Sequence, residues 1–176
     1  MTSRFFIVPL ALLATPAVVH ATTYMSVEQA QAQMFPGEAL KPDFHTLTDA
    51  QMAAIHRESG EAPLNRDLKA WRAADGGWFI LDQVVGKHEF ITFALALDGS
   101  GAVKSMEILD YRESYGGQVR EAAWRSQFVG RRYGAPLKLG QDVRNISGAT
   151  LSSKHMTDGV RRLLATYAFV LAPGGR

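Results

Sequence analysis

The chain has 176 residues, with 19 basic and 17 acidic side chains, a formal net charge of +2 and no cysteine. The near-neutral balance argues against nucleic-acid binding, which needs a basic surface that displaces counterions. The lack of cysteine excludes disulfides, thiolate catalysis, cysteine-ligated zinc and iron–sulfur clusters.

The first 21 residues are typical of a secretory signal peptide. Arg4 precedes an apolar run, Phe5–Val19, and Val19-His20-Ala21 fits the small-x-small rule for a cleavage site. The run contains two prolines and is shorter than the ~20 residues of a membrane span. We therefore expect export and cleavage near Ala21, with an uncleaved anchor at the outer face of the inner membrane as the alternative. Cleavage leaves roughly 155 residues, enough for one domain with a core.

Two short helices are predicted in the next part of the chain. Ser26-Val27-Glu28-Gln29 and Thr48-Asp49-Ala50-Gln51 both match the capping box, in which a hydroxyl and a glutamine side chain satisfy backbone amides at a helix start. The first helix is expected to end near Phe35 and the second near Gly60. We therefore assign residues 22–66 to an N-terminal helical segment.

Four β-strands are predicted at the start of the main domain, residues 67–172. Their expected ranges are Lys69–Arg72, Trp78–Val84, His88–Leu97 and Val103–Tyr111. In the third strand, one face would carry the larger apolar residues Ile91, Phe93, Leu95 and Leu97. Ala74-Asp75-Gly76-Gly77 and Asp98-Gly99-Ser100-Gly101 are turn sequences between neighbouring strands. The strands therefore form an antiparallel meander.

The rest of the domain is predicted to contain a loop, a short helix, an edge strand and a long helix. Arg112-Glu113-Ser114-Tyr115-Gly116-Gly117 is the loop, Val119–Val129 the short helix and Leu137–Leu139 the edge strand. Apolar residues at helical spacing predict a final helix from about Leu151 to Phe169. Strands grouped together, with short flanking helices and a long C-terminal helix, indicate an α+β fold.

The junction before the final helix concentrates small and hydroxyl-bearing residues. Gly148 allows a backbone shape closed to other residues, and Ala149 leaves the approach to the helix open. Four hydroxyl groups lie within seven positions, those of Ser147, Thr150, Ser152 and Ser153. A helix N-terminus with free amides can bind an anion such as a phosphate. Because Thr150 or Ser152 could also be an ordinary N-cap, the pattern by itself leaves phosphate binding and simple capping both open.

Ser147-Gly148-Ala149-Thr150 resembles the attachment motif of the FMN-binding domain family. That family includes the flavin-carrying subunits of sodium-pumping NADH:quinone reductases and small exported bacterial flavoproteins. The similarity covers about residues 74–170 and extends to the Asp98-Gly99 turn, the loop that begins at Arg112, and the Asp158-Gly159-Val160 step. The resemblance implies that FMN binds here, with its phosphate esterified to the Thr150 hydroxyl. It also implies cofactor-binding positions at Ser147, Gly148, Ala149, Leu151, Ser152, Glu113 and Gly116.

One position departs from the pattern of the family. Members that receive FMN from the flavin transferase usually carry an acidic residue three positions before the motif, where this chain has Arg144. Asn145 lies beside it, and Asp142 two residues earlier. The departure bears on covalent attachment more than on FMN binding.

The resemblance implies an exported flavoprotein that carries electrons between membrane or periplasmic redox partners, rather than a stand-alone enzyme. An exported FAD-dependent flavin transferase would attach the FMN, and the mature protein would lie in the periplasm or at the outer face of the inner membrane. Residues 22–66 would either cap the domain or dock a redox partner. Two alternatives stay open: a non-redox binding module that has lost the flavin, and a small flavin-dependent reductase.

Other catalytic and metal-binding patterns are incomplete in the sequence. Ser152 and Lys154 are not in the Ser-x-x-Lys spacing, and the mature chain contains no Gly-x-Ser-x-Gly motif. His88-Glu89 lacks the second histidine of the zinc-protease pattern, since position 92 is threonine. We therefore predict no catalytic residues and no metal site.

Overall fold

The structure is a computed structural model that describes residues 22–113 and 115–174. The signal-peptide prediction for residues 1–21 lies outside the described residues, as does Ser114 of the predicted loop. Within the part of the chain that is described, no helix is both long and apolar enough to cross a membrane.

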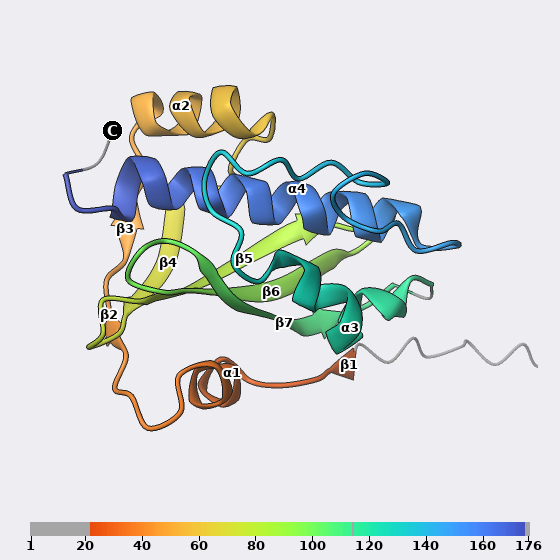
Figure 1. The fold of residues 1–176 in the computed structure, drawn as a ribbon, viewed down its shortest axis with the longest axis horizontal. Coiled ribbons are helices and arrows are strands. Elements are labelled where there is room, and N and C mark those ends of the chain that lie inside the picture. Colours follow the sequence, from red (N-terminus) through yellow and green to blue (C-terminus); the bar gives the residue numbers. More distant parts are fainter. Residues whose placement is uncertain (1–21, 114, 175–176) are drawn as a thin grey trace, which may run out of the picture.

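An antiparallel sheet runs through the middle of the molecule (Figure 1). Across the sheet the strands are β1 (Thr22–Thr23), β7 (Val103–Tyr111), β6 (Phe90–Leu97), β5 (Trp78–Val85), β4 (Asp67–Arg72) and β2 (Lys41–Pro42), while β3 (His45–Thr46) also pairs with β4. Strands β4 to β7 pair in chain order as an antiparallel meander. The predicted α+β fold is confirmed.

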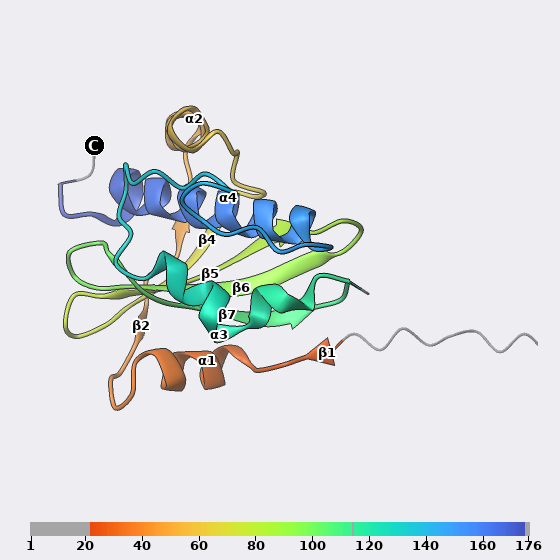
Figure 2. The same cartoon turned by 45° about the vertical axis from the view of Figure 1, so that its right-hand side comes forward.

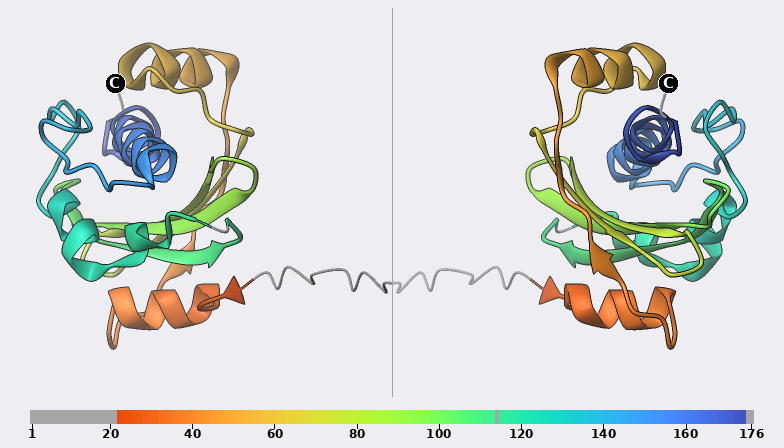
Figure 3. Two further views of the ribbon diagram at one scale, coloured as in Figure 1. Left: turned by 90° about the vertical axis from the view of Figure 1, so that its right-hand side faces the viewer. Right: turned by 90° about the vertical axis from the view of Figure 1, so that its left-hand side faces the viewer.

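Helices cover both faces of this sheet. The long helix α4 (Thr150–Thr166) crosses one face, and α1 (Val27–Met34) lies on the other (Figures 1 and 2). In views turned by 90° from Figure 1, α4 lies between the sheet and α2 (Asp49–Ser59), which packs on the outer side of α4 (Figure 3). The alternating residues of β6 explain these layers, because Phe93 and Leu95 belong to the large core under α4, whereas Ala94 belongs to the smaller core on the side of α1.

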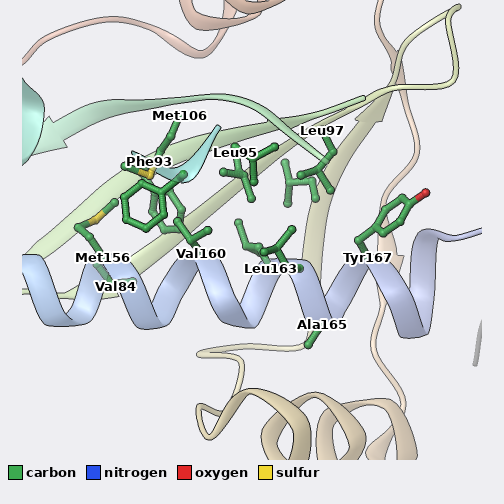
Figure 4. Packing of buried hydrophobic residues seen from close by; sticks show 14 of the residues in the cluster. Val84, Phe93, Leu95, Leu97, Met106, Met156, Val160, Leu163, Ala165 and Tyr167 are labelled. Carbon is green, nitrogen blue, oxygen red and sulfur yellow. The ribbon is translucent and has the colours of Figure 1, made fainter. Parts of the chain in front are cut away.

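Close packing sets where α4 lies on the sheet. Met156 and Val160 of α4 and Phe93 of β6 belong to the same buried core (Figure 4). At Gly159 the helix is so near the sheet that an added Cβ would be 2.6 Å from Cγ1 of Val84. Glycine at this position therefore lets α4 rest directly on β5, which brings the start of the helix near the β5–β6 turn.

The two N-terminal helices begin with the predicted capping boxes. The Ser26 hydroxyl accepts from the Gln29 amide at 3.2 Å, and the Gln29 side chain accepts from the Ser26 amide at 2.8 Å. Thr48 and Gln51 make the same pair of hydrogen bonds at 3.2 and 2.9 Å. Gly60 ends α2 with a φ of +78°. The capping predictions are confirmed.

The predicted helix over Val119–Val129 is wrong. The chain instead makes a 3₁₀ turn at Gly117–Arg120, the short helix α3 (Ala122–Arg125) and a second 3₁₀ turn at Ser126–Phe128. Glu121 has an extended backbone, with φ −64° and ψ 129°, which separates the first turn from α3. The apolar spacing marked buried residues correctly but did not require one continuous helix.

Three further details differ from the sequence prediction. Leu137–Leu139 is not an edge strand, because Leu139 makes only an isolated bridge with Val143. Residues 22–66 contain the two helices and also β1, β2 and β3, each two residues long. Strands this short produce no periodic pattern. The final helix continues past α4 as a π turn at Tyr167–Leu171.

Candidate functional site

The start of α4 leaves backbone donors without protein partners. Gly148 turns the chain with a φ of +80°, and Ala149 is the N-cap, so the expectation of Thr150 or Ser152 in that role is wrong. The Ala149 side chain makes no hydrogen bond to the helix amides. The first hydrogen bond of the helix runs from the Ser153 amide to the Ala149 carbonyl, at 2.9 Å. Among the described residues, the amides of Thr150, Leu151 and Ser152 have no acceptor. This end of the helix therefore combines free N–H groups with the positive end of the helix dipole.

A cavity of about 520 Å³ opens at this helix start. Three separate segments line it: Gly148–Ser152 from the start of α4, Glu113 and Tyr115 from the loop after β7, and Lys87 and His88 from the β5–β6 turn. Lys87, His88 and Tyr115 are exposed at the cavity. The walls thus offer amides, hydroxyls, a cation, an aromatic ring and the half-exposed apolar side chain of Leu151.

Glu113 fastens two of these segments together. Its Oε1 accepts from the backbone amides of His88 and Glu89, at 2.6 and 3.0 Å. Burial raises the pKa of Glu113, but hydrogen bonds from the amides of the β5–β6 turn lower it more, so the pKa lies below its ordinary value. A Cβ at Gly86 would be 2.5 Å from the same carboxylate oxygen, so glycine makes room for this contact. The carboxylate is therefore ionised at neutral pH and positions the Lys87–His88 turn.

A buried hydroxyl pair connects the loop after β7 to α4. The Tyr111 Oη and the Ser152 Oγ lie 3.0 Å apart, and the Tyr111 hydroxyl also donates to the carbonyl of Tyr115. Burial raises the pKa of Tyr111, although its hydrogen bond with Ser152 acts in the opposite direction. A Cβ at Gly116 would be 2.6 Å from the Tyr111 Oη and 2.8 Å from the Ser152 Oγ. Gly116 thus allows the loop to pack against the helix start.

The segment before α4 is held from its other side. The indole Nε1 of Trp124 donates to the carbonyl of Arg144 at 2.7 Å, and the Arg144 amide donates to the Gln127 side chain at 2.8 Å. Asn145 then donates from its side-chain amide to the Thr150 Oγ1 at 3.2 Å. Thr150 is exposed, so its hydroxyl faces the cavity and solvent while its oxygen keeps a protein donor.

The FMN-binding domain model matches residues 86–165, a range that contains all three segments of the cavity wall. This segment is therefore similar to FMN-binding domains. The chain also aligns with the solved structure of one subunit of the Na(+)-translocating NADH-quinone reductase from Parabacteroides distasonis, with 13% sequence identity and a TM-score of 0.49. That alignment covers 82% of this chain and 84% of the other. No curated protein matches the chain.

The cavity in the matched segment fits the chemistry of FMN. A phosphate needs hydrogen-bond donors and positive charge, which the free amides of Leu151 and Ser152, the Thr150 hydroxyl and Lys87 supply. The flavin ring is aromatic and needs apolar or aromatic walls, which Leu151 and Tyr115 supply. Across the described residues, no group of three or more histidine or carboxylate side chains could hold a metal ion.

The structure brings most of the sequence-predicted positions to this one cavity. Those that line it are Gly148, Ala149, Thr150, Leu151, Ser152 and Glu113. Gly116 lies directly behind the wall against Ser152, whereas Ser147 is exposed and does not line the cavity. Ser147 therefore belongs to the turn that leads into the helix.

Sequence reasoning misses Lys87 and His88 as part of the site. From the sequence, His88 is weighed only as a zinc ligand and as the first residue of a strand, whereas β6 begins at Phe90 and both residues belong to the turn. The missed signal is the sequence Gly86-Lys87-His88, a glycine followed by basic residues at the end of a hairpin. Their place beside α4 depends on pairing and packing between distant parts of the chain.

Proposed function

We propose that this chain is an exported flavoprotein that carries electrons, with FMN held in the cavity at the start of α4. One observation carries the proposal: the uncapped start of α4 opens into a cavity of about 520 Å³ inside the segment that matches the FMN-binding domain. When bound, FMN supplies the reversible uptake and release of electrons.

The residues of the cavity would divide the work of binding between the two ends of the cofactor. The amides of Leu151 and Ser152 would hold the phosphate, and the nearby ammonium of Lys87 would offset its negative charge. Glu113 would keep the β5–β6 turn in place through its two backbone hydrogen bonds. Because the Glu113 carboxylate is negatively charged, it would repel the phosphate and would not bind it directly. Its role would be to position the turn.

We further propose that Thr150 forms a phosphoester with FMN. Its hydroxyl is exposed at the cavity and lies at the first position of α4, next to the free amides. In the attachment step the Thr150 oxygen bonds to the flavin-side phosphorus of FAD, the bond from that phosphorus to the bridging oxygen breaks, AMP leaves, and the hydroxyl proton is released. An exported FAD-dependent flavin transferase would catalyse this step. The hydrogen bond from the Asn145 side chain would hold the threonine oxygen in place. Asn145 directly follows Arg144, which takes the position of the family's usual acidic residue.

The proposed location follows from the start of the sequence. Arg4, the apolar run Phe5–Val19 and the Val19-His20-Ala21 sequence support export and cleavage near Ala21. The mature protein would then lie in the periplasm or at the outer face of the inner membrane, and would exchange electrons with membrane or periplasmic redox proteins. A covalent link suits this location, since a flavin lost outside the cytoplasm is not easily replaced.

The decisive test is the colour and mass of the exported protein. The full chain would be produced in a host that carries the flavin transferase, and the mature protein would be measured by visible absorbance and intact mass. We expect a flavin spectrum and an added mass equal to FMN bound as an ester. After denaturing electrophoresis, the protein band should fluoresce.

Two variants of one residue locate the attachment point. Thr150→Val keeps the shape of the side chain without its hydroxyl and should abolish the fluorescent band, whereas Thr150→Ser should retain it. A colourless wild-type protein of unmodified mass would overturn the flavoprotein proposal. A band that persists in Thr150→Val would keep the flavoprotein but move the attachment to another hydroxyl, with Ser152 the nearest candidate at the cavity.

A further inference from the structure

Tyr115 is unusually exposed for an aromatic residue. With 83% of its surface accessible, it is the most exposed large apolar side chain within residues 22–113 and 115–174. It lines the cavity at the start of α4 from the loop after β7. An aromatic ring left in water at the mouth of a cavity marks a surface that a ligand can cover.

The backbone of this residue is fixed although its ring is not covered. The Tyr115 carbonyl accepts a hydrogen bond from the buried hydroxyl of Tyr111, and the next residue, Gly116, packs against Tyr111 and Ser152. Among the described residues, the Tyr115 ring makes no stacking or cation–π contact. The ring is therefore presented at the cavity from a well-anchored position.

Among the described residues, Tyr115 is also the only phenylalanine, tyrosine or tryptophan that lines this cavity. Trp78 and Trp124 are 2% and 3% exposed and lie in the core. Phe44 is exposed at 59%, but it contacts Trp71 and lies between β2 and β3 at the other edge of the sheet. The cavity thus has one phenol ring in its wall, and the apolar side chain of Leu151 comes from a different element.

We propose that Tyr115 lies against one face of the flavin ring and tunes its redox behaviour, an inference that rests on the proposed function. Stacking of an electron-rich phenol favours the electron-poor oxidised ring over the electron-rich reduced ring. Tyr115 therefore lowers the midpoint potential of the bound flavin. A phenol in contact with the ring also quenches flavin fluorescence by donating an electron to the excited state, and the electron returns afterwards.

The test uses the flavin-loaded exported chain and four variants. Tyr115→Ala removes the ring, Tyr115→Phe keeps a ring that cannot quench, and Tyr115→Trp keeps both the ring and the quenching. Phe44→Ala removes an exposed aromatic residue at the other edge of the sheet and serves as the matched control. Flavin content, fluorescence yield per flavin and midpoint potential would be measured for each.

We expect Tyr115→Ala to show a severalfold higher fluorescence yield per bound flavin and a higher midpoint potential of the flavin that it carries. Tyr115→Phe should gain fluorescence while its potential stays closer to that of the wild type, and Tyr115→Trp should stay quenched. Phe44→Ala should match the wild type in all three measurements. Wild-type fluorescence and potential in flavin-loaded Tyr115→Ala would overturn the inference while leaving the flavoprotein intact. A wild-type protein without flavin would overturn the proposed function and this inference together.

Discussion

The helices of this protein begin in two different ways. At α1 and α2, Ser26 and Thr48 cap the first amides by reciprocal hydrogen bonds with a glutamine three residues later. At α4, the longest helix described, the N-cap is Ala149, which has no side-chain oxygen, although hydroxyl residues follow it directly. A helix start without a cap gives up about 1 kcal/mol. The first amides of α1 and α2 are thus hydrogen-bonded within the protein, whereas those of α4 are free to donate to a ligand.

The largest expected effect comes from placing a carboxylate at the N-cap of α4. In Ala149→Asp a carboxylate would lie at the N-cap, where it would accept from the free amides and repel a phosphate. We expect the dissociation constant for FMN to rise by about tenfold or more, and the occupancy at limiting FMN to fall with it, since about 1.4 kcal/mol of repulsion corresponds to a tenfold change in affinity. Occupancy would be measured by visible absorbance against protein concentration.

The stability of the flavin-free protein sharpens this test. The thermal midpoint of flavin-free Ala149→Asp should be no lower than that of the flavin-free wild type, because the new carboxylate caps the helix. The neutral variant Ala149→Ser controls for side-chain size at this buried position and should keep most of the flavin. Full flavin occupancy in Ala149→Asp would contradict a phosphate at the start of α4.

Alanine substitutions at two glycines with positive φ distinguish the cost of overpacking from the cost of backbone strain at the site. Gly116→Ala places a Cβ against the Tyr111 and Ser152 hydroxyls, so we expect overpacking of about 1–3 kcal/mol and about 1–2 kcal/mol of backbone strain. Gly148→Ala meets no atom within 4 Å and should show only the strain. Chemical denaturation of both flavin-free variants would measure the difference. Equal losses would mean that Gly116 is not held against the helix start.

The capped helices should respond in the opposite sense to α4. Ser26→Ala and Thr48→Ala each remove a capping hydroxyl, and each should lower the free energy of unfolding by about 1 kcal/mol. Neither change should alter flavin content, because both caps lie outside the segment that matches the FMN-binding domain. Denaturation and absorbance on the same samples test both statements. A loss of flavin from either variant that remains folded would break the distinction between the two kinds of helix start.

Local signals were enough to predict much of this fold. Both capping boxes, the alternation along β6 and the turns of the meander depend on residues within a few positions of each other. The same holds for the start of the final helix, which differs from the prediction by one residue. Hydrogen bonds and side-chain periodicity at this range leave a direct pattern in the sequence.

The parts that sequence reasoning missed depend on contacts between distant residues. Lys87 and His88 reach the cavity because Glu113, about 25 positions later, accepts hydrogen bonds from their turn. Gly116 is expected from the sequence to bind the cofactor, whereas the structure places it behind the cavity wall, where it makes room for Tyr111 and Ser152. The three-part shape of the segment at 117–128 likewise depends on packing, since its apolar spacing also suits one helix. The motif located one wall of the cavity, and tertiary packing supplied the others.

Glu113 offers the smallest and most specific test. Its carboxylate accepts hydrogen bonds from backbone amides of the β5–β6 turn, in the way that a bound anion would accept them from the amides of α4. Burial raises its pKa, but the amides of Glu89, His88 and Lys87 lower it more, so the folded value lies below the ordinary 4.5. The ionised carboxylate therefore stabilises the fold above that value, and the contribution is lost as the pH falls through the lowered folded pKa. Glu113→Gln should be less stable than the wild type at neutral pH, and the gap in thermal midpoint should shrink as the pH falls below 4.5 and through the lowered folded pKa. Glu121→Gln, a change at an exposed glutamate, should show no such gap. If the difference in thermal midpoint between Glu113→Gln and the wild type stayed constant with pH, the charge of the carboxylate would not stabilise the β5–β6 turn. Another contact would then have to position Lys87 and His88 at the cavity.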